Sequence, residues 1–224
     1  TTMAGTGTFG TYEEDNIQAT SARIGSIGGL AINAAGDLFM ADEGNHCVKK
    51  IVNSTQIMTT VAGKCMWGNG GYFGVNVTAT SAKLNAPIGV AVNSNEEIVI
   101  ADRDNHRIRK VTIDGMIHSI AGNGIAEFSQ ARAIAIDAVL YDPASLIVTN
   151  DGEIIINDNG NSQIRKVDRN GIITTIAGNG LWGFGGDGGS ALNALLRNAG
   201  DVVVRDDGDL LVADTERLTN MERL

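Results

Sequence analysis

Apolar and polar positions follow one another in short runs along the chain, and these runs have the length of β-strands. The clearest stretch begins with a nearly continuous apolar run at 89–93 and continues with runs at 96–102, 106–112 and 115–122. Turn-forming residues separate the runs, and the pair Asp-Gly at 114–115 is a strong signal for a tight β-hairpin. The pattern predicts four antiparallel strands in a sheet that is covered on both faces.

This stretch is one copy of a repeat. An aspartate follows the second expected strand of each copy at intervals of 60, 56 and 56 residues, and an Ala-Gly pair follows the fourth at nearly the same spacing. Repeated units that cannot bury both faces alone stack against one another. We therefore expect an all-β fold, a β-propeller of four four-stranded blades in a single domain. The units cover approximately 1–58, 59–117, 118–173 and 174–224.

The repeat is out of phase with the ends of the printed chain. Residues 1–5 match the end of a fourth strand, and the last residues match a third strand. Because an unpaired sheet edge finds a partner, three arrangements follow. The N-terminal strand completes the last blade within a four-bladed ring, the chain forms an arc of a larger propeller, or neighbouring chains pair head to tail.

Two longer stretches carry a family resemblance. "NHRIRKVTIDGMIHSIAGNG" and "GIITTIAGNGLWGFGGDGGSALNALL" strongly resemble NHL repeats, of the long-period type found in bacterial and protist surface proteins and in teneurins. The resemblance covers essentially the whole chain, although Asn157 and Ser162 depart from it and the fourth unit lacks the "NHRIRK" string. It implies a propeller, more usually of six blades. Some NHL-like propellers are lyases or hydrolases, but we find no matching set of metal-binding histidines here and expect no enzyme.

The repeated aspartates are the first candidates for a polar site. One interpretation makes them a ring that binds a ligand or cation; the favoured one is that each accepts hydrogen bonds within its own turn. His46 and His106 occupy equivalent positions in neighbouring units, too far apart to share a zinc ion. The "DGG" triplet has too few carboxylates for a proper calcium loop, so calcium is the one cofactor left open. The turn residues are Asp42, Asn45, Asp102, Asn105, Asp158, Asn161 and Asp214.

Aromatic residues gather in the long connections between units. Eight of the ten lie there, including Phe9 and Tyr12. Such residues anchor protein interfaces and stack on sugars, although each loop can instead fold over its own aromatic residue to make a small satellite core. The candidate binding residues are Trp67, Tyr72, Phe73, Phe128, Trp182 and Phe184.

Net charge and cysteine usage restrict the partners and the cellular location that we expect. The net charge of −9 argues against a nucleic-acid partner, and no apolar run is long enough to predict membrane insertion. Cys47 and Cys65 lie nearly opposite each other in one expected hairpin, which favours a disulfide and an extracellular or cell-surface setting. Asn53 and Asn76 begin glycosylation sequons.

These observations predict a non-catalytic extracellular module that binds protein or glycan through its aromatic loops. The first alternative is a structural subunit that assembles through its incomplete blade, and the second is an NHL-like enzyme.

Overall fold

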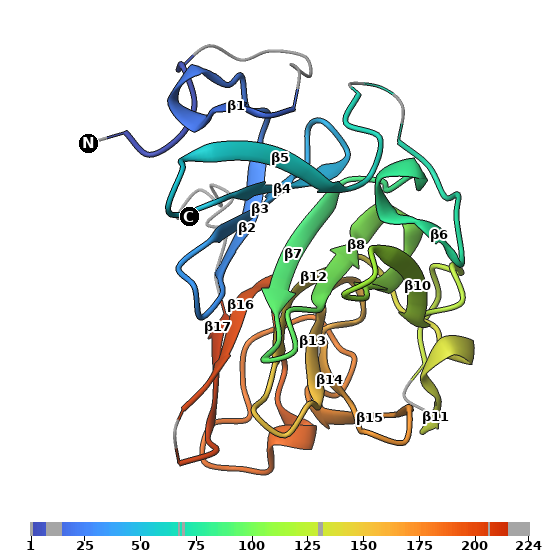
Figure 1. Ribbon diagram of the computed structural model, residues 1–224. Coiled ribbons are helices and arrows are strands. Elements are labelled where there is room, and N and C mark those ends of the chain that lie inside the picture. The colour runs from blue at the N-terminus through green and yellow to red at the C-terminus, as the bar shows by residue number, and fades with distance from the viewer. Residues whose placement is uncertain are drawn as a thin grey trace, which may run out of the picture.

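The computed structural model describes residues 2–7, 15–66, 68, 70–129, 132–205 and 207–214. It is all-β, with four antiparallel sheets that follow one another along the chain (Figure 1). The first three sheets have five strands each, in the orders β1-β5-β4-β3-β2, β6-β10-β9-β8-β7 and β11-β15-β14-β13-β12. The described part of the fourth sheet is the pair β16-β17.

The strands and 3-10 turns repeat with little variation. In the first sheet they are β1 Ile17–Gln18, η1 Ala19–Ser21, β2 Ile27–Ile32, β3 Leu38–Asp42, β4 Cys47–Ile51 and β5 Ile57–Ala62. In the second they are β6 Val77–Thr78, η2 Ala79–Ser81, β7 Pro87–Val92, β8 Ile98–Asp102, η3 Arg103–Asn105, β9 Arg107–Val111 and β10 Met116–Ala121. In the third they are β11 Ala133–Ile134, η4 Ala135–Asp137, β12 Pro143–Val148, β13 Ile154–Asp158, η5 Asn159–Asn161, β14 Gln163–Val167 and β15 Ile172–Ala177. The last elements are η6 Ala191–Asn193, β16 Ala199–Val204 and β17 Leu210–Asp214.

The four main strands of the first three sheets confirm the sequence prediction, and the structure adds a two-residue fifth strand at the outer edge. In the second sheet, β6 pairs with β10, so that Val77 lies opposite Ile117. The strand comes from the connection before β7, not from the preceding sheet. Each of the first three sheets therefore ends at its outer edge in a short strand from the loop that precedes its own first main strand.

A second recurring contact joins each sheet to the next. The glycine after each fourth strand donates its N–H to a carbonyl of the following 3-10 turn, as in Gly63 N to Ala79 O and Gly122 N to Ala135 O, both at 2.9 Å. These glycines have φ between 83° and 86°, a left-handed conformation that favours glycine. The repeated Ala-Gly pair therefore marks a junction between sheets.

The N-terminal segment follows the same rule without being a strand. Gly5 N donates to Ala19 O and Thr6 N donates to Ala22 O, both at 2.9 Å. Among the described residues, 2–7 form no strand pair with β16 or β17. The third strand that this segment is expected to complete, at the end of the fourth unit, lies outside the described residues, so the completion of the last blade by the N-terminal strand stays a prediction.

Apolar packing between sheets builds the core. The innermost strands pack in the order β2, β7, β12 and β16. One cluster joins Phe39 of the first sheet to Val90 of the second, another joins Val99 to Leu146, and a third joins Ile155 to Val202. These residues occupy two repeated positions, one on the second strand of each sheet and one on the first strand of the next. Both faces of the two middle sheets are covered, as the apolar runs predicted.

Candidate functional site

The repeated aspartates lie inside the sheets. The side chains of Asp42, Asp102 and Asp158 are buried, whereas Asp214 is exposed. Asp102 accepts a hydrogen bond from the Asn85 backbone N–H at 2.7 Å and another from Asn105 Nδ2 at 2.9 Å. Asn45 and Asn161 make the same 2.9 Å contact with their own aspartates. These hydrogen bonds connect the end of the second main strand to the loop before the first main strand. The buried carboxylates therefore accept hydrogen bonds from N–H groups of the protein.

Two of these aspartates face a buried arginine. Arg109 Nη1 lies 3.4 Å from Asp102 Oδ2, and Arg165 Nη1 lies 3.6 Å from Asp158 Oδ2, with all four side chains shielded from solvent. Burial raises the pKa of Asp102 and of Asp158 to about 6, although the asparagine and arginine donors act in the opposite direction. In the first sheet the equivalent cation is Lys49, which instead pairs with Asp15 at 3.2 Å.

The first residue of the third main strand differs among the first three sheets in how it holds the loop that leaves the fourth main strand. In the first sheet Cys47 forms a disulfide with Cys65, with a Cα–Cα distance of 5.0 Å. At the equivalent position of the second sheet, Arg107 donates through Nη1 to Gly122 O at 2.7 Å and through Nη2 to Asn123 O at 2.6 Å. Both contacts hold the loop that leaves the fourth strand. In the third sheet Gln163 is fully buried, and its Nε2 has no hydrogen-bond partner among the described residues.

The histidines contact the next sheet rather than each other. His46 Nδ1 accepts a hydrogen bond from the Ala86 backbone N–H at 3.0 Å, and His106 Nδ1 accepts one from the Asp142 backbone N–H at 3.2 Å. They therefore serve two separate junctions. In the described part of the chain, no three His, Cys, Asp or Glu side chains gather in a way that could hold a metal ion.

In the loop between β5 and β6, two arginine side chains lie against the ring of Tyr72. Arg107 and Arg109 place their guanidinium carbons 4.3 Å and 5.0 Å from the centre of the Tyr72 ring. The Tyr72 hydroxyl also lies 3.3 Å from Ser119 Oγ. Tyr72 and the adjacent Phe73 are exposed. Cation–π contacts of this kind orient the aromatic ring, while Tyr72 stays partly accessible to solvent.

The loop after β15 repeats this arrangement. The Arg197 guanidinium lies 4.1 Å from the centre of the Trp182 ring. Trp182 is 62% exposed and Phe184 is 79% exposed, and the backbone bridges Trp182–Leu196 and Gly185–Leu195 fold the loop back on itself. Phe128, in the loop after β10, is exposed as well. No described buried cluster contains these rings. Trp67, Phe9 and Tyr12 lie outside the described residues.

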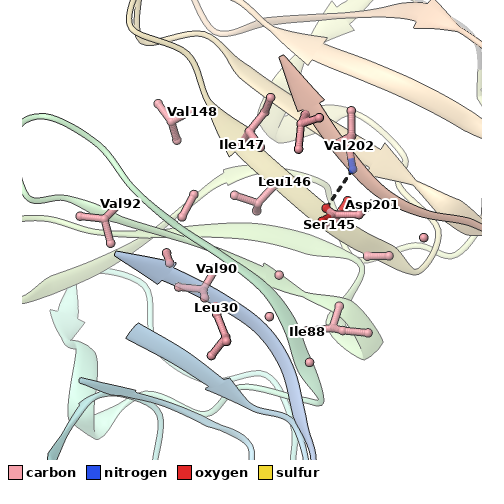
Figure 2. Close-up of a pocket in the computed structure, with 18 of the residues that line it drawn as sticks. Leu30, Ile88, Val90, Val92, Ser145, Leu146, Ile147, Val148, Asp201 and Val202 are labelled. Atoms are coloured by element: carbon pink, nitrogen blue, oxygen red, sulfur yellow. Dashed lines mark hydrogen bonds between the residues drawn. The ribbon is translucent and has the colours of Figure 1, made fainter. Parts of the chain in front are cut away.

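A central cavity of about 480 Å³ lies between the four innermost strands (Figure 2). Its described lining consists of apolar and glycine residues apart from Ser145 and Asp201. The carboxylate of Asp201 accepts a hydrogen bond from the Val202 backbone N–H at 2.8 Å, and the buried Ser145 Oγ has no described hydrogen-bond partner. One carboxylate without a second titratable group in the lining does not make an acid–base pair.

The two sequons differ in their surroundings. Asn53 and Asn76 are both exposed. Asn53 Nδ2 donates to Ala35 O at 3.3 Å, and its backbone N–H donates to Asp37 Oδ1 at 2.9 Å. Asn76 lies in the loop before β6 and uses its backbone N–H for a contact with Ile117 O at 2.9 Å.

None of the helices in the described residues is long and apolar enough to cross a membrane.

Comparisons with known proteins agree with the repeat. The model of the NHL repeat matches residues 84–111. Human teneurin-4 is 33% identical over 158 residues, which is 63% of this chain and 6% of teneurin-4. Protein SUPPRESSOR OF QUENCHING 1, chloroplastic, from Arabidopsis thaliana is 24% identical over 225 residues, which is 96% of this chain and 21% of that protein. The chain thus spans about a fifth or less of the length of these relatives.

Solved structures share the architecture. An auxiliary nutrient binding protein from Bacteroides ovatus superposes with a TM-score of 0.63 at 15% identity, over 86% of this chain and 46% of that chain. A gluconolactonase from Xanthomonas campestris superposes with a TM-score of 0.54 at 15% identity, over 84% of this chain and 54% of that chain. Identities this low establish the fold alone. The repeat, the sheets in tandem and these similarities agree: the chain carries an NHL repeat at 84–111 and has a β-propeller fold similar to that of NHL-repeat proteins.

Proposed function

We propose that this chain is a non-catalytic, extracellular interaction module that binds protein or glycan through its aromatic loops. The observation that carries the proposal is the loop of Trp182 and Phe184. Both rings are largely exposed, and Arg197 stacks on one of them. Exposing large apolar rings costs free energy in water, and ordered exposed rings are typical of surfaces that bind partners. The Tyr72 loop has the same arrangement on another sheet.

The cavity supports the non-catalytic part of the proposal. Its lining offers Asp201 as a titratable side chain, and that carboxylate already accepts a backbone N–H. General acid–base or nucleophilic catalysis needs a second group within hydrogen-bond reach. The similarity to a gluconolactonase therefore concerns the fold.

Binding can be tested with a glycan array and an array of purified secreted proteins. We expect the wild-type chain to bind at least one of these probes, and we expect the double variant Trp182→Ala/Phe184→Ala to bind it at least about tenfold more weakly, as for a lost hot spot. Ile113, on a hairpin turn, is 81% exposed, so Ile113→Ala is the matched control. An absence of binding to either array, or equal binding by the double variant, would contradict the proposal.

The extracellular setting has its own test. After secretion from eukaryotic cells, we expect peptide mapping to find the Cys47–Cys65 disulfide and a glycan on Asn76. We expect less modification at Asn53, because its Nδ2, the atom that would carry the glycan, already donates a hydrogen bond to Ala35 O. An unmodified Asn76 together with free thiols would contradict this setting.

A further inference from the structure

The chain is acidic as a whole, but one internal stretch has the opposite charge. The chain contains 26 Asp and Glu residues, and none of them lies between residues 44 and 95, where four lysines occur. Two of these lysines form ion pairs with aspartates from other parts of the chain. The other two are Lys64, which follows β5, and Lys83, which follows η2. A local excess of positive charge in an acidic chain favours an anionic partner at that place.

Backbone pairing places one of these lysines beside an aromatic ring. Phe73 and Lys83 form an isolated antiparallel bridge, in which the Lys83 N–H donates to Phe73 O at 3.0 Å. Residues directly opposite each other in an antiparallel pair point their side chains to the same side, with Cβ atoms about 5 Å apart. The side chain of Phe73 is 54% exposed. An exposed ring and an ammonium group are thus neighbours on the loop formed by residues 70–76, which we call the Phe73 loop.

Two arginines lie against the same loop, at the ring of Tyr72. Arg109 faces the buried Asp102, which balances its charge. Arg107 donates its hydrogen bonds to two backbone carbonyls instead, and it forms no ion pair with a carboxylate among the described residues. The charge of Arg107 therefore adds to that of the lysines.

The other two aromatic loops are balanced in charge. Each of them contains one acidic and one basic residue, which are Glu127 and Arg132 after β10, and Asp187 and Arg197 after β15. The Phe73 loop contains no acidic residue. An anionic ligand would therefore meet an aromatic ring and positive charge there without repulsion from a carboxylate of the same loop.

We propose that the Phe73 loop binds an acidic glycan, whose sugar rings carry carboxylate or sulfate groups. This inference rests on the proposed function and names the class of glycan. The Phe73 ring stacks on a sugar face, and the cations of Lys83 and Arg107 attract the anionic substituents. Gly71 and Gly74 lie on either side of the two aromatic residues and carry no side chains that could wall a pocket. The surface therefore suits a flat sugar ring better than the anchoring side chain of a peptide, which needs a pocket.

Biolayer interferometry with the 224-residue chain tests the class of ligand. Polygalacturonate and dextran sulfate are the acidic probes, and methyl-esterified polygalacturonate and unmodified dextran are their neutral counterparts. We expect the chain to bind at least one acidic probe about tenfold more tightly than its neutral counterpart, since charge complementarity is lost in the latter. Raising NaCl from about 0.05 M to about 0.5 M should weaken this binding about fivefold, because salt screens exposed charges.

The possible outcomes separate this inference from the proposed function. Equal binding of an acidic probe and its neutral counterpart, or no binding to either acidic probe, would overturn the inference, whereas binding to a neutral glycan or a protein on the arrays would still support the proposed function. Polyglutamate carries carboxylates on a peptide. Tighter binding to polyglutamate than to both acidic glycans would overturn the inference in favour of an acidic peptide.

Single substitutions locate the site. We expect Phe73→Ala to weaken binding to the acidic probe about tenfold, as for a lost hot spot, and Lys83→Gln to weaken it about threefold, the value of an exposed ion pair. Lys110→Gln removes a lysine of β9 that pairs with Glu97 at 3.0 Å, and as the matched control it should bind like the wild type. None of the three side chains is buried, so the variants should fold, which circular dichroism checks. Wild-type affinity in both Phe73→Ala and Lys83→Gln would overturn the inference.

Discussion

The first and second sheets hold the loop after their fourth main strand with different chemistry. In both, the residue that begins the third strand holds the loop leaving the fourth strand. The first sheet uses a covalent bond from Cys47, and the second uses two hydrogen bonds from Arg107 to carbonyls. The third sheet has Gln163 there, and its Nε2 has no hydrogen-bond partner in the part of the chain that the structure describes. The repeated backbone therefore requires a tether of suitable length more than it requires any one residue type.

The disulfide should make the largest difference between the sheets. We expect Cys47→Ala/Cys65→Ala to lower the free energy of unfolding by about 3 kcal/mol, because the bridge closes a short loop in the unfolded chain. Urea unfolding measures this loss. A reducing agent should produce a similar loss in the wild type and none in the double variant. An unfolding midpoint that does not respond to the reductant would show that the tether is dispensable.

The arginine tether should matter somewhat less. We expect Arg107→Met to lower the free energy of unfolding by about 2 kcal/mol, because two charge-assisted hydrogen bonds to carbonyls are lost. Arg107→Lys should recover only part of this, since an ammonium group cannot reach both carbonyls in a fork. Urea unfolding again provides the measurement. Full recovery by lysine would mean that the charge, and not the paired geometry, stabilises the loop.

The third sheet should respond in the opposite direction. Gln163→Met removes a buried amide whose nitrogen has no partner among the described residues, and keeps most of the side-chain volume. We therefore expect the free energy of unfolding to rise by about 1 kcal/mol. Gln163→Glu, of the same shape, should instead be destabilising because it buries a charge. Thermal unfolding of both variants decides this, and a destabilising Gln163→Met would imply that the amide has a partner.

The smallest expected effect concerns the histidine at the first junction. Burial lowers the pKa of His46, although Asp104, Asp42 and Glu43 oppose the shift. The unfolded chain therefore binds this proton more readily than the folded one, and stability is lost as pH falls through the His46 pKa of the unfolded chain. Protonation also removes the acceptor for the Ala86 N–H.

We expect wild-type urea unfolding between pH 7.5 and pH 5 to lose about 1 kcal/mol more than that of His46→Gln, roughly the value of one hydrogen bond. The buried aspartates Asp102 and Asp158 act in the opposite sense. Their pKa of about 6 in the folded state gives stability that is present at low pH and lost as pH rises through 6. This contribution is common to both proteins and cancels in the comparison. His118→Gln, on an outer strand, is the control and should follow the wild type. Parallel pH profiles for His46→Gln and the wild type would contradict the role of His46.

Much of the architecture could be predicted because its signals repeat. The aspartates after each second strand and the Ala-Gly pairs mark both the strands and the period. The outer strands β1, β6 and β11 were missed, since two residues are too few to show an alternating pattern. The alanines at 19, 79, 135 and 191 recur at the start of the 3-10 turn that precedes the first main strand of each sheet, and this was the available signal.

The candidate site could be predicted only in part. The aromatic residues were visible as a class, but the arginines that stack on them come from other strands or from distant loop positions. Arg107 is 35 residues after Tyr72, and Arg197 is 15 after Trp182. The tether was also hidden, because the acceptors of Arg107 are backbone carbonyls and carry no side-chain signature.

The glycine contacts between sheets also determine how the molecule opens. Gly63, Gly122 and Gly178 each connect one sheet to the next, so these contacts couple each sheet to its neighbour along the chain. The second and third sheets are packed on both faces, and β8 and β13 are buried along their whole length, whereas β17 is largely exposed. Amide protons should therefore exchange with solvent more slowly in β8 and β13 than in β17.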